Sequence, residues 1–252
     1  MSAPMPFNEL TTDNLIAHRG LQARFPENTR LSLAKAIEVG AKYIELDVQF
    51  SADHLPIIYH DANLQRVSDR RELVSSLNRQ QLLNCSAHEP QRFGDLYITE
   101  KIAPLEALVE LLQANPQVTA FVEIKRDSIP YCGRDLMVQS VQSILKPVSN
   151  RTVIISDDYK LVQIARVLGW PNVGIVLEQW QDLLHPIVVD CRADFIFAEQ
   201  PMLPQTLAEN TIPQSTQLVV YEVGDLVLGK HLLSLGVDML ETFNLEDFLA
   251  NG

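Results

Sequence analysis

Residues 43–47 read Tyr-Ile-Glu-Leu-Asp, and this short stretch points to the fold class of the chain. Its apolar residues favour a buried β-strand, while Glu45 and Asp47 lie two positions apart. Alternate residues of a strand point to the same face, so the two carboxylates should project together. Because carboxylates are costly to bury without partners, the pair is expected at the mouth of a barrel, where strands carry catalytic groups.

Similar strand-like runs recur along the chain, and amphipathic stretches separate most of them. The predicted strands are Leu15–His18, Tyr43–Asp47, Thr119–Lys125, Thr152–Ser156, Val173–Leu177, Asp194–Ala198, Leu218–Val223 and Asp238–Glu241. Several are continuous apolar runs, as expected for parallel strands that are covered on both faces. Strands alternating with helices favour an α/β fold, a (β/α)8 TIM-type barrel. A doubly wound open sheet is the competing architecture, because the pattern alone fits both.

Five stretches between these strands have the three-to-four spacing of amphipathic helices. The predicted helices are Thr29–Val39, Pro104–Ala114, Arg134–Leu145, Asp158–Leu168 and Asp225–Leu235. Gly40 and Gly236 follow the first and last of them, and Pro104 suits a first helical turn. Each predicted helix therefore lies between two predicted strands.

One segment breaks this alternation. After the second strand, a short turn leads to Ile57–Tyr59 and then to His60, which indicates a hairpin excursion over the barrel mouth. Residues 62–103 have weak periodicity and are interpreted as a small inserted subdomain, which in barrels commonly shapes substrate access. No linker divides the rest, so residues 1–252 are predicted to form a single barrel domain.

The composition excludes several classes of partner. Twenty basic residues against 32 acidic ones give a net charge of −12, which disfavours nucleic acid and anionic membranes. An anionic substrate would therefore need local positive charge. No apolar run is long enough to span a bilayer, and the N-terminus lacks the features of a signal peptide, so a cytoplasmic location without stable membrane insertion is expected. The sequence carries no signal of oligomeric state.

Polar clusters stand at the ends of several predicted strands and of the hairpin. They are His18-Arg19-Gly20, Glu45-Leu46-Asp47, His60-Asp61 and Glu123-Ile124-Lys125. Glu45, Asp47 and Glu123 would repel one another at a shared mouth, and a divalent cation would resolve that conflict. All-oxygen ligands favour Mg²⁺, Ca²⁺ or Mn²⁺ over zinc. The alternative is an ion-pair network that joins Glu123 to Lys125 and Glu45 to Arg19.

His18 and His60 each have a charged neighbour in sequence. A lone histidine on an apolar strand is more often a core residue, but two in such settings favour acid–base catalysis. Paired histidines can supply both an acid and a base near neutral pH. Arg19 and Lys125 would provide the local positive charge that an anionic group requires.

Taken in order, the motifs resemble those of the glycerophosphodiester phosphodiesterase family. They are His18-Arg19-Gly20, Glu27-Asn28-Thr29, Glu45-Leu46-Asp47-Val48-Gln49, His60-Asp61 and Glu123-Ile124-Lys125. Each triplet alone is weak evidence, but the ordered set is specific. The match is close over residues 16–64, clear at 104–112 and 119–125, and general beyond.

The resemblance implies a distorted (β/α)8 barrel with a small insertion between its second and third strands. It also implies hydrolysis of a small glycerophosphodiester to glycerol 3-phosphate and an alcohol, by attack of the neighbouring glycerol hydroxyl and opening of a cyclic phosphate by water. By motif position, it implies metal binding by Glu45, Asp47 and Glu123, acid–base catalysis by His18 and His60, and phosphate binding by Arg19 and Lys125.

Three stretches depart from the usual motifs of the family. Ala52-Asp53-His54 replaces a Lys-Asp-Gly turn, Tyr221-Glu222-Val223-Gly224 replaces a tryptophan-led stretch, and Thr242-Phe243 replaces Thr-Asp. These changes bear on substrate preference rather than on activity, because every proposed ligand and histidine is kept. Tyr221 is predicted either to line the substrate pocket or to pack in the core. Glu27 and Asn28 either belong to the site or brace the loop and start the next helix.

Two other functions remain open from the sequence. One is a lysophospholipase D-like diesterase that acts on a longer lipid, which an exposed apolar rim beside the mouth would favour. The other is a non-catalytic barrel that binds metal or phosphate.

Overall fold

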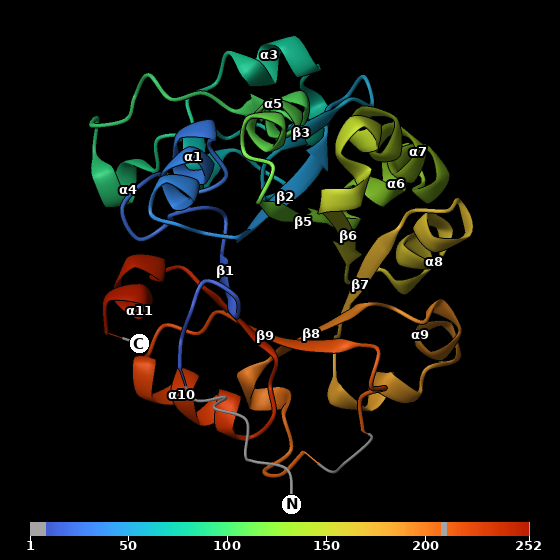
Figure 1. Ribbon diagram of the computed structural model, residues 1–252. Helices are drawn as coiled ribbons and strands as arrows, with labels where there is room; N and C mark the ends of the chain where they lie inside the picture. The colour runs from blue at the N-terminus through green and yellow to red at the C-terminus, as the bar shows by residue number, and fades with distance from the viewer. Residues whose placement is uncertain (1–8, 208–210, 252) are drawn as a thin grey trace, which may run out of the picture.

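The strands close into a barrel in the computed structural model, which describes residues 9–207 and 211–251 (Figure 1). Within these residues, the parallel barrel strands are β1 (Leu15–Ala17), β2 (Tyr43–Phe50), β5 (Thr119–Ile124), β6 (Thr152–Ser156), β7 (Asn172–Val176), β8 (Phe195–Glu199), β9 (Gln217–Tyr221) and β10 (Met239–Thr242). The barrel closes because β1 pairs with both β2 and β10. This closure confirms the predicted (β/α)8 barrel and excludes the open sheet.

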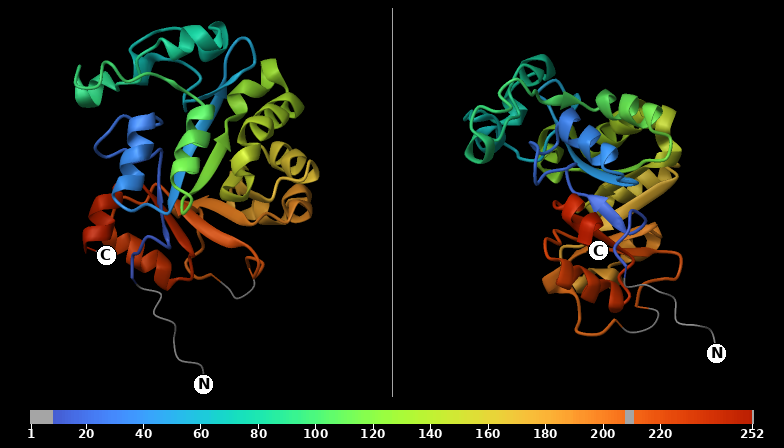
Figure 2. Two further views of the ribbon diagram at one scale, coloured as in Figure 1. Left: turned by 45° about the horizontal axis from the view of Figure 1, so that its top comes forward. Right: turned by 60° about the vertical axis from the view of Figure 1, so that its left-hand side comes forward.

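Helices surround the barrel and bury the outer face of its strands (Figures 1 and 2). The longer ones are α1 (Arg30–Glu38), α5 (Glu106–Ala114), α7 (Arg134–Leu145), α8 (Tyr159–Val167) and α10 (Leu226–Ser234). They match the five predicted helices to within two residues at each end. The pattern missed α6 (Ile129–Cys132), α9 (Pro186–Cys191) and α11 (Leu245–Asn251), which are too short to show a clear helical period.

The start of one helix was predicted wrongly. Pro104 belongs to the short strand β4 (Ala103–Pro104), and α5 begins only at Glu106. β4 pairs with β3 (Pro56–Ile58) at the edge of the sheet, where a proline without an N–H is tolerated. The edge pairing therefore outweighs the preference of proline for a first helical turn.

The insertion begins with the predicted hairpin, because β3 runs antiparallel to β2. Short helices follow between β3 and β4: α2 (Gln65–Ser68), η1 (Val74–Ser76), α3 (Arg79–Leu83) and α4 (Pro90–Phe93). All of them except α4 contribute to a small core, which is formed by Ile57, Tyr59, Leu64, Val67, Val74, Leu82, Cys85, Ala87 and Ile102. This core is separate from those of the barrel, which supports our proposal that residues 62–103 form an inserted subdomain. The insertion lies at one end of the molecule (Figure 2).

Short 3₁₀ helices occupy several of the connections that follow barrel strands or helices. They are η2 (Arg126–Ser128), η3 (Lys146–Arg151), η4 (Trp180–Leu184) and η5 (Gln200–Met202). Among the helices of the described chain, none is long and apolar enough to cross a membrane.

An apolar layer fills the barrel interior beneath its mouth. It consists of Ile16, Phe121, Val153, Ile155, Phe197, Val219 and Met239. The ring of Phe121 meets those of Phe195 and Phe197 edge-on, with centroids 4.9 and 5.3 Å apart. Glu123 lies two residues after Phe121 in β5, so its side chain points to the same face of the strand. The apolar layer is therefore the floor on which the charged side chains of the mouth rest.

Replacing Phe121 tests the importance of this floor. We expect Phe121→Ala to lower the free energy of unfolding by about 3–5 kcal/mol, because it opens a cavity that its neighbours cannot fill. Urea denaturation measures the change, and Phe121→Leu should recover part of it. The exposed Val227 provides the control, since Val227→Ala should stay within about 0.5 kcal/mol of the original protein. Equal losses in Phe121→Ala and Val227→Ala would contradict the role of the ring.

Candidate active site

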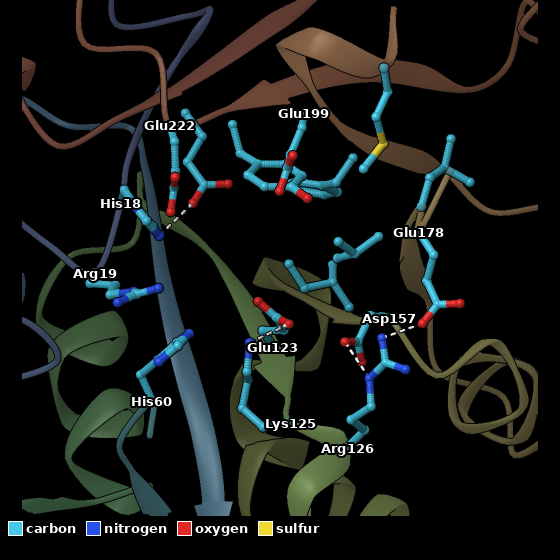
Figure 3. A pocket seen from close by; sticks show the side chains of 17 residues that line it. His18, Arg19, His60, Glu123, Lys125, Arg126, Asp157, Glu178, Glu199 and Glu222 are labelled. Atoms are coloured by element: carbon cyan, nitrogen blue, oxygen red, sulfur yellow. Dashed lines mark hydrogen bonds and ion pairs between the residues drawn. The ribbon is translucent and has the colours of Figure 1, made fainter. Parts of the chain in front are cut away.

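A cavity of about 370 Å³ opens at the carboxyl ends of the barrel strands (Figure 3). Of the residues predicted to form a site, the ones that line it are His18, Arg19, His60, Glu123, Lys125 and Tyr221. The other two, Glu45 and Asp47, are buried within ion-pair distance of lining residues. The structure thus brings together groups that lie up to two hundred residues apart in the chain.

The loop after β1 has a conformation that depends on glycine. Arg19 and Gly20 have φ values of 51° and 82°, both in the left-handed region. A Cβ atom on Gly20 would lie 2.6 Å from the carbonyl carbon of Ser32 and 2.7 Å from the backbone nitrogen of Leu33. Helix α1 can therefore approach this loop only because residue 20 has no side chain.

This tight turn aims Arg19 at the carboxylates of β2. The Arg19 backbone N–H donates to Oε2 of Glu45 at 3.0 Å. Its guanidinium lies on Asp47, with 3.0 Å between Nε and Oδ2, and its Nη1 donates to Glu27 at 3.0 Å. One residue thus contacts three buried carboxylates.

Glu45, Asp47 and Glu123 form a compact oxygen cluster. One carboxylate oxygen from each lies within 4.8 Å of the others. Burial, and after it the charge of Asp47, raises the pKa of Glu45 well above its usual range. Burial also raises the pKa of Glu123, whereas Arg19 and Lys125 outweigh burial and lower the pKa of Asp47.

The donor set fits an oxygen-ligated divalent cation. The Oε1 atom of Glu45 is buried and has no hydrogen-bond partner. Within the described residues, no lysine or arginine side chain lies within ion-pair distance of Glu45. The guanidinium of Arg19 forms its ion pairs with Asp47 and Glu27 instead. A cation held by the cluster would satisfy the orphan oxygen and offset the mutual repulsion.

The predicted ion-pair network is present only in part. Lys125 Nζ lies 2.9 Å from Oε1 of Glu123 and 3.6 Å from Oδ1 of Asp47. The expected pairing of Glu45 with the Arg19 side chain is replaced by the backbone hydrogen bond. The network compensates two of the three carboxylates, so it does not remove the need for a further positive charge.

Glu27 and Asn28 have both of the roles considered from the sequence: they contact residues of the site, and they brace the loop before the next helix. The Asn28 side-chain N–H donates to Oδ2 of Asp47 at 2.8 Å, and the Asp47 backbone N–H donates to Oδ1 of Asn28 at 3.0 Å. Thr29 caps α1 by accepting a hydrogen bond through its hydroxyl. Glu27 accepts from Arg19. The loop therefore starts the helix and also braces the side chains of the site.

His18 is buried beside an acidic residue that the sequence analysis missed. Its Nε2 lies 3.4 Å from Oε1 of Glu241 and 3.9 Å from Oε2 of Glu45. Burial, and then the charge of Arg19, lowers the pKa of His18 to about 3. Glu241 is itself almost fully buried in β10 and lines the cavity. The signal for Glu241 in the sequence was weak, because it ends the predicted strand Asp238–Glu241, which begins with a second carboxylate.

His60 follows β3 and makes a hydrogen bond of 2.7 Å with Asp61, through Nδ1 and Oδ1. Burial opposes ionisation of Asp61, but hydrogen bonds from His60 and Arg66 outweigh it and lower the pKa of this carboxyl group. An ionised carboxylate can only accept, so Nδ1 of His60 carries the hydrogen. The Nε2 atom of His60 is therefore the ring nitrogen available to a ligand in the cavity.

Arg66, in α2 of the insertion, joins two parts of the site. Its Nε and Nη2 donate to Asp61 at 2.9 and 2.8 Å. Its Nη1 and Nη2 donate to Glu27, each at 2.7 Å. Since Asp61 holds His60 and Glu27 holds Arg19, one guanidinium positions two residues that line the cavity.

Tyr221 also has both of its predicted roles, since it lines the cavity and packs in the core. It ends β9, packs against the apolar layer inside the barrel and lines the cavity. Burial, and then the charge of Glu199, raises the pKa of its hydroxyl. The aromatic side chain is thus part of both the floor and the wall.

The fold and this site together define a class, a (β/α)8 barrel with an acidic oxygen cluster, two cations and two histidines at its mouth. The chain belongs to the glycerophosphoryl diester phosphodiesterase family, whose sequence model matches residues 18–166. This match confirms the family expected from the ordered motifs.

Known relatives share part of their length with this chain. Glycerophosphodiester phosphodiesterase 1 of Bos taurus is 34% identical over 111 residues, which are 44% of this chain and 33% of that protein. A glycerophosphodiester phosphodiesterase of Caldanaerobacter subterraneus is 27% identical over 166 residues, 65% of this chain and 66% of its own. An Oleispira antarctica phosphodiesterase, solved in complex with the product sn-glycerol-3-phosphate, has the same fold, with a TM-score of 0.83, 21% identity and coverage of 94% and 95% of the two chains.

The link through Arg66 can be tested by stability. We expect Arg66→Met to lower the free energy of unfolding by about 2 kcal/mol, because Glu27 is left buried without its main partner. The double variant Arg66→Met/Glu27→Gln should lose less than the sum of the single changes, as measured by urea denaturation. Arg24→Met, which breaks an exposed pair with Glu246, is the control and should have little effect. Additive losses would show that Arg66 and Glu27 are not coupled.

Proposed function

We propose that this protein hydrolyses small glycerophosphodiesters to glycerol 3-phosphate and an alcohol in a reaction that requires a divalent metal ion. One observation carries the proposal: a single cavity is surrounded by an oxygen cluster, two cations and two histidines. Membership of the family supports it. These are the groups that cleavage of an anionic diester with a poor leaving group requires.

Arg19 and Lys125 are proposed to bind the phosphodiester. Both line the cavity, and each is held by buried carboxylates that keep it in place. Burial opposes the charge of Lys125, but Glu123 and Asp47 outweigh it and raise the pKa of the amine. The cavity lining contains more acidic than basic side chains, so these two fixed cations, together with the proposed metal ion, supply the positive charge that an anionic diester requires.

Glu45, Asp47 and Glu123 are proposed to hold the metal ion, with Mg²⁺ or Ca²⁺ as the expected ion and Mn²⁺ as an accepted one. The donor set consists of carboxylate oxygens only, which suits these hard cations. When bound, the ion would polarise a phosphoryl oxygen and offset the negative charge that develops there.

His18 and His60 are proposed as the acid–base pair. One histidine removes the proton of the neighbouring glycerol hydroxyl as its oxygen attacks phosphorus, and the other protonates the departing alkoxide. Water then opens the resulting cyclic phosphate. The hydroxyl belongs to the same molecule as the phosphorus, so the attack has a large advantage in effective concentration. Both imidazoles line the cavity, on either side of Arg19 in Figure 3.

A longer lipid substrate is less well supported. Within the described residues, none of the exposed large apolar side chains lines the cavity, although Phe243 directly follows the carboxyl end of β10. One exposed ring beside the mouth does not make the continuous apolar rim that would favour a lysophospholipase D-like enzyme. The cytoplasmic location stays a prediction from the sequence.

Removal of either histidine tests catalysis and the non-catalytic alternative. We expect His18→Ala and His60→Ala each to lower the rate by roughly 10²–10⁴-fold, the range for loss of a general acid or base. A coupled assay for glycerol 3-phosphate, run on a panel of glycerophosphodiesters, measures the rate. His231→Ala, at an exposed position on α10, is the matched control and should remain active. Near-normal turnover in His18→Ala or His60→Ala would refute the assignment.

Removal of the metal ion tests the oxygen cluster. We expect activity to disappear after EDTA treatment and dialysis, and to return with added Mg²⁺, Ca²⁺ or Mn²⁺. Calorimetric titration with Mn²⁺ gives a readout that is independent of turnover. Glu45→Gln should weaken Mn²⁺ binding by roughly tenfold or more, since it removes a charged ligand. Glu38→Gln, on the exposed face of α1, should bind as the original protein does, and full activity after chelation would contradict the proposal.

A further inference from the structure

Gln49 joins two segments of the proposed site that are far apart in the sequence. It follows Asp47 by two residues in β2, so both side chains point to the same face of the strand. Gln49 is only 1% exposed and is not part of the cavity lining. Its side-chain amide donates through Nε2 to the carbonyl oxygen of His60 at 2.9 Å. The amide therefore holds the backbone of a proposed acid–base residue without occupying the space of a substrate.

The strand pairing of the hairpin ends just before His60. β3 ends at Ile58, and the N–H of Tyr59 then donates to the carbonyl oxygen of Asp47 at 2.9 Å. His60 is the next residue, and its own carbonyl oxygen accepts the hydrogen bond from the Gln49 side chain. The side chain thus extends the contact between β2 and the hairpin to the residue that bears the imidazole.

The loop after β5 holds the same amide from its other end. Oε1 of Gln49 accepts from the hydroxyl of Ser128 at 2.7 Å, and its Nε2 also donates to Oδ2 of Asp127 at 3.3 Å. Ser128 is fully buried, and its Oγ accepts from the backbone N–H of Phe50 at 3.0 Å. Both ends of the amide therefore have partners, as a buried polar side chain requires.

The partners of Gln49 also fix which way its amide faces. The carbonyl of His60 and the carboxylate of Asp127 can only accept hydrogen bonds, so the NH₂ group has to face them. A reversed amide would place its oxygen against these two acceptors. An N–H donor is therefore needed at residue 49 to hold His60, and a side chain of similar size without an N–H cannot replace it.

The loop that holds Gln49 also carries Lys125, the proposed ligand of the phosphodiester. The backbone N–H of Lys125 donates to the carbonyl oxygen of Val48 at 3.0 Å, and η2, with Ser128 at its end, follows directly. Residues 48–50 of β2 thus contact both the loop of Lys125 and the segment of His60. This shared attachment sets the position of the imidazole relative to the group that binds phosphate.

We propose that Gln49 is a positioning residue, whose amide fixes His60 relative to Lys125 so that the imidazole meets a phosphodiester held by the lysine. The proposal rests on the proposed function and adds to it a residue outside the cavity. Gln49 neither touches the substrate nor exchanges a proton. It acts through His60, because proton transfer requires the imidazole within hydrogen-bond reach of the reacting oxygen.

Replacing the amide by a thioether of similar length tests the proposal. We expect Gln49→Met to lower kcat by roughly tenfold to a hundredfold, since a displacement of about 1 Å from the productive geometry has an effect of this size. KM should stay within about twofold, because Arg19 and Lys125 still bind the diester. Calorimetric titration should give an unchanged affinity for Mn²⁺. The control is Gln113→Met at an exposed position of α5, which should leave kcat unchanged.

The background of His60→Ala separates positioning from a general structural role. If Gln49 acts only through the imidazole, adding Gln49→Met to His60→Ala should lower the residual rate by less than about twofold. Ser128→Ala is a milder second variant, because the amide keeps its contact with His60 and loses the hydroxyl that fixes it. It should lower kcat by less than Gln49→Met does, again with KM unchanged.

NMR gives a measurement that needs no turnover. Proton–nitrogen correlation spectra distinguish the two neutral tautomers of a histidine, and His60→Ala identifies the signals of His60. Asp61 contacts Nδ1 of His60, so the tautomer with hydrogen on Nδ1 should dominate in the original protein. Gln49→Met loosens the backbone of His60, so the other tautomer should appear. Gln113→Met should give the original spectrum.

The outcomes separate this proposal from the proposed function. An unchanged kcat in Gln49→Met, or an equal loss with and without His60, would overturn the positioning role and leave the phosphodiesterase proposal intact. A parallel loss of Mn²⁺ affinity would also overturn it, because the amide would then act on the oxygen cluster. If the original protein cleaves no glycerophosphodiester, the proposed function fails by itself. An unchanged His60 spectrum in Gln49→Met would overturn the positioning role in an active or an inactive protein alike.

Discussion

The repulsion among carboxylates buried at the barrel mouth is the constraint on which the rest of the site depends. Glu45, Asp47 and Glu241 are buried and Glu123 is partly buried, and desolvation is the largest influence on the pKa of each. Arg19 and Lys125 compensate only part of this charge. A protein can keep such groups together only if something else offsets them, and the unpartnered oxygen of Glu45 shows where the compensation is incomplete.

The same constraint explains why the loop after β1 has so little freedom. The left-handed turn at Arg19 and Gly20 allows one residue to donate from its backbone to Glu45 and to place its guanidinium on Asp47. A side chain at residue 20 would collide with the backbone of α1. The glycine is therefore a condition for the electrostatics of the site, although it contributes no functional group itself.

The insertion takes part in this arrangement through ionic contacts. Arg66 joins Glu27 to Asp61, and Oε2 of Glu89 accepts a hydrogen bond of 2.7 Å from the Glu27 backbone N–H. Arg92 in turn donates to Glu89. The segment with the weakest sequence pattern thus supports the loop that positions Arg19. Its short helices could not be predicted, because four or five residues do not display a helical period.

The sequence by itself determined which groups share a strand face. The two-residue period of β2 and β5 aligns Glu45 with Asp47 and Glu123 with Lys125, and this relation is local and independent of the rest of the fold. The starts of two helices were likewise predicted to within one residue, since the predicted first residues, Thr29 and Asp225, are the N-caps in the structure and capping involves only neighbouring residues.

Only the tertiary structure decided which strand ends meet. Glu241 reaches His18 because β10 pairs with β1 when the barrel closes, across more than two hundred residues of chain. The edge pairing of β4 likewise moved Pro104 out of the predicted helix. Local periodicity specifies the direction of a side chain along its own strand. Its partner across the mouth depends on closure and register, which are properties of the whole sheet.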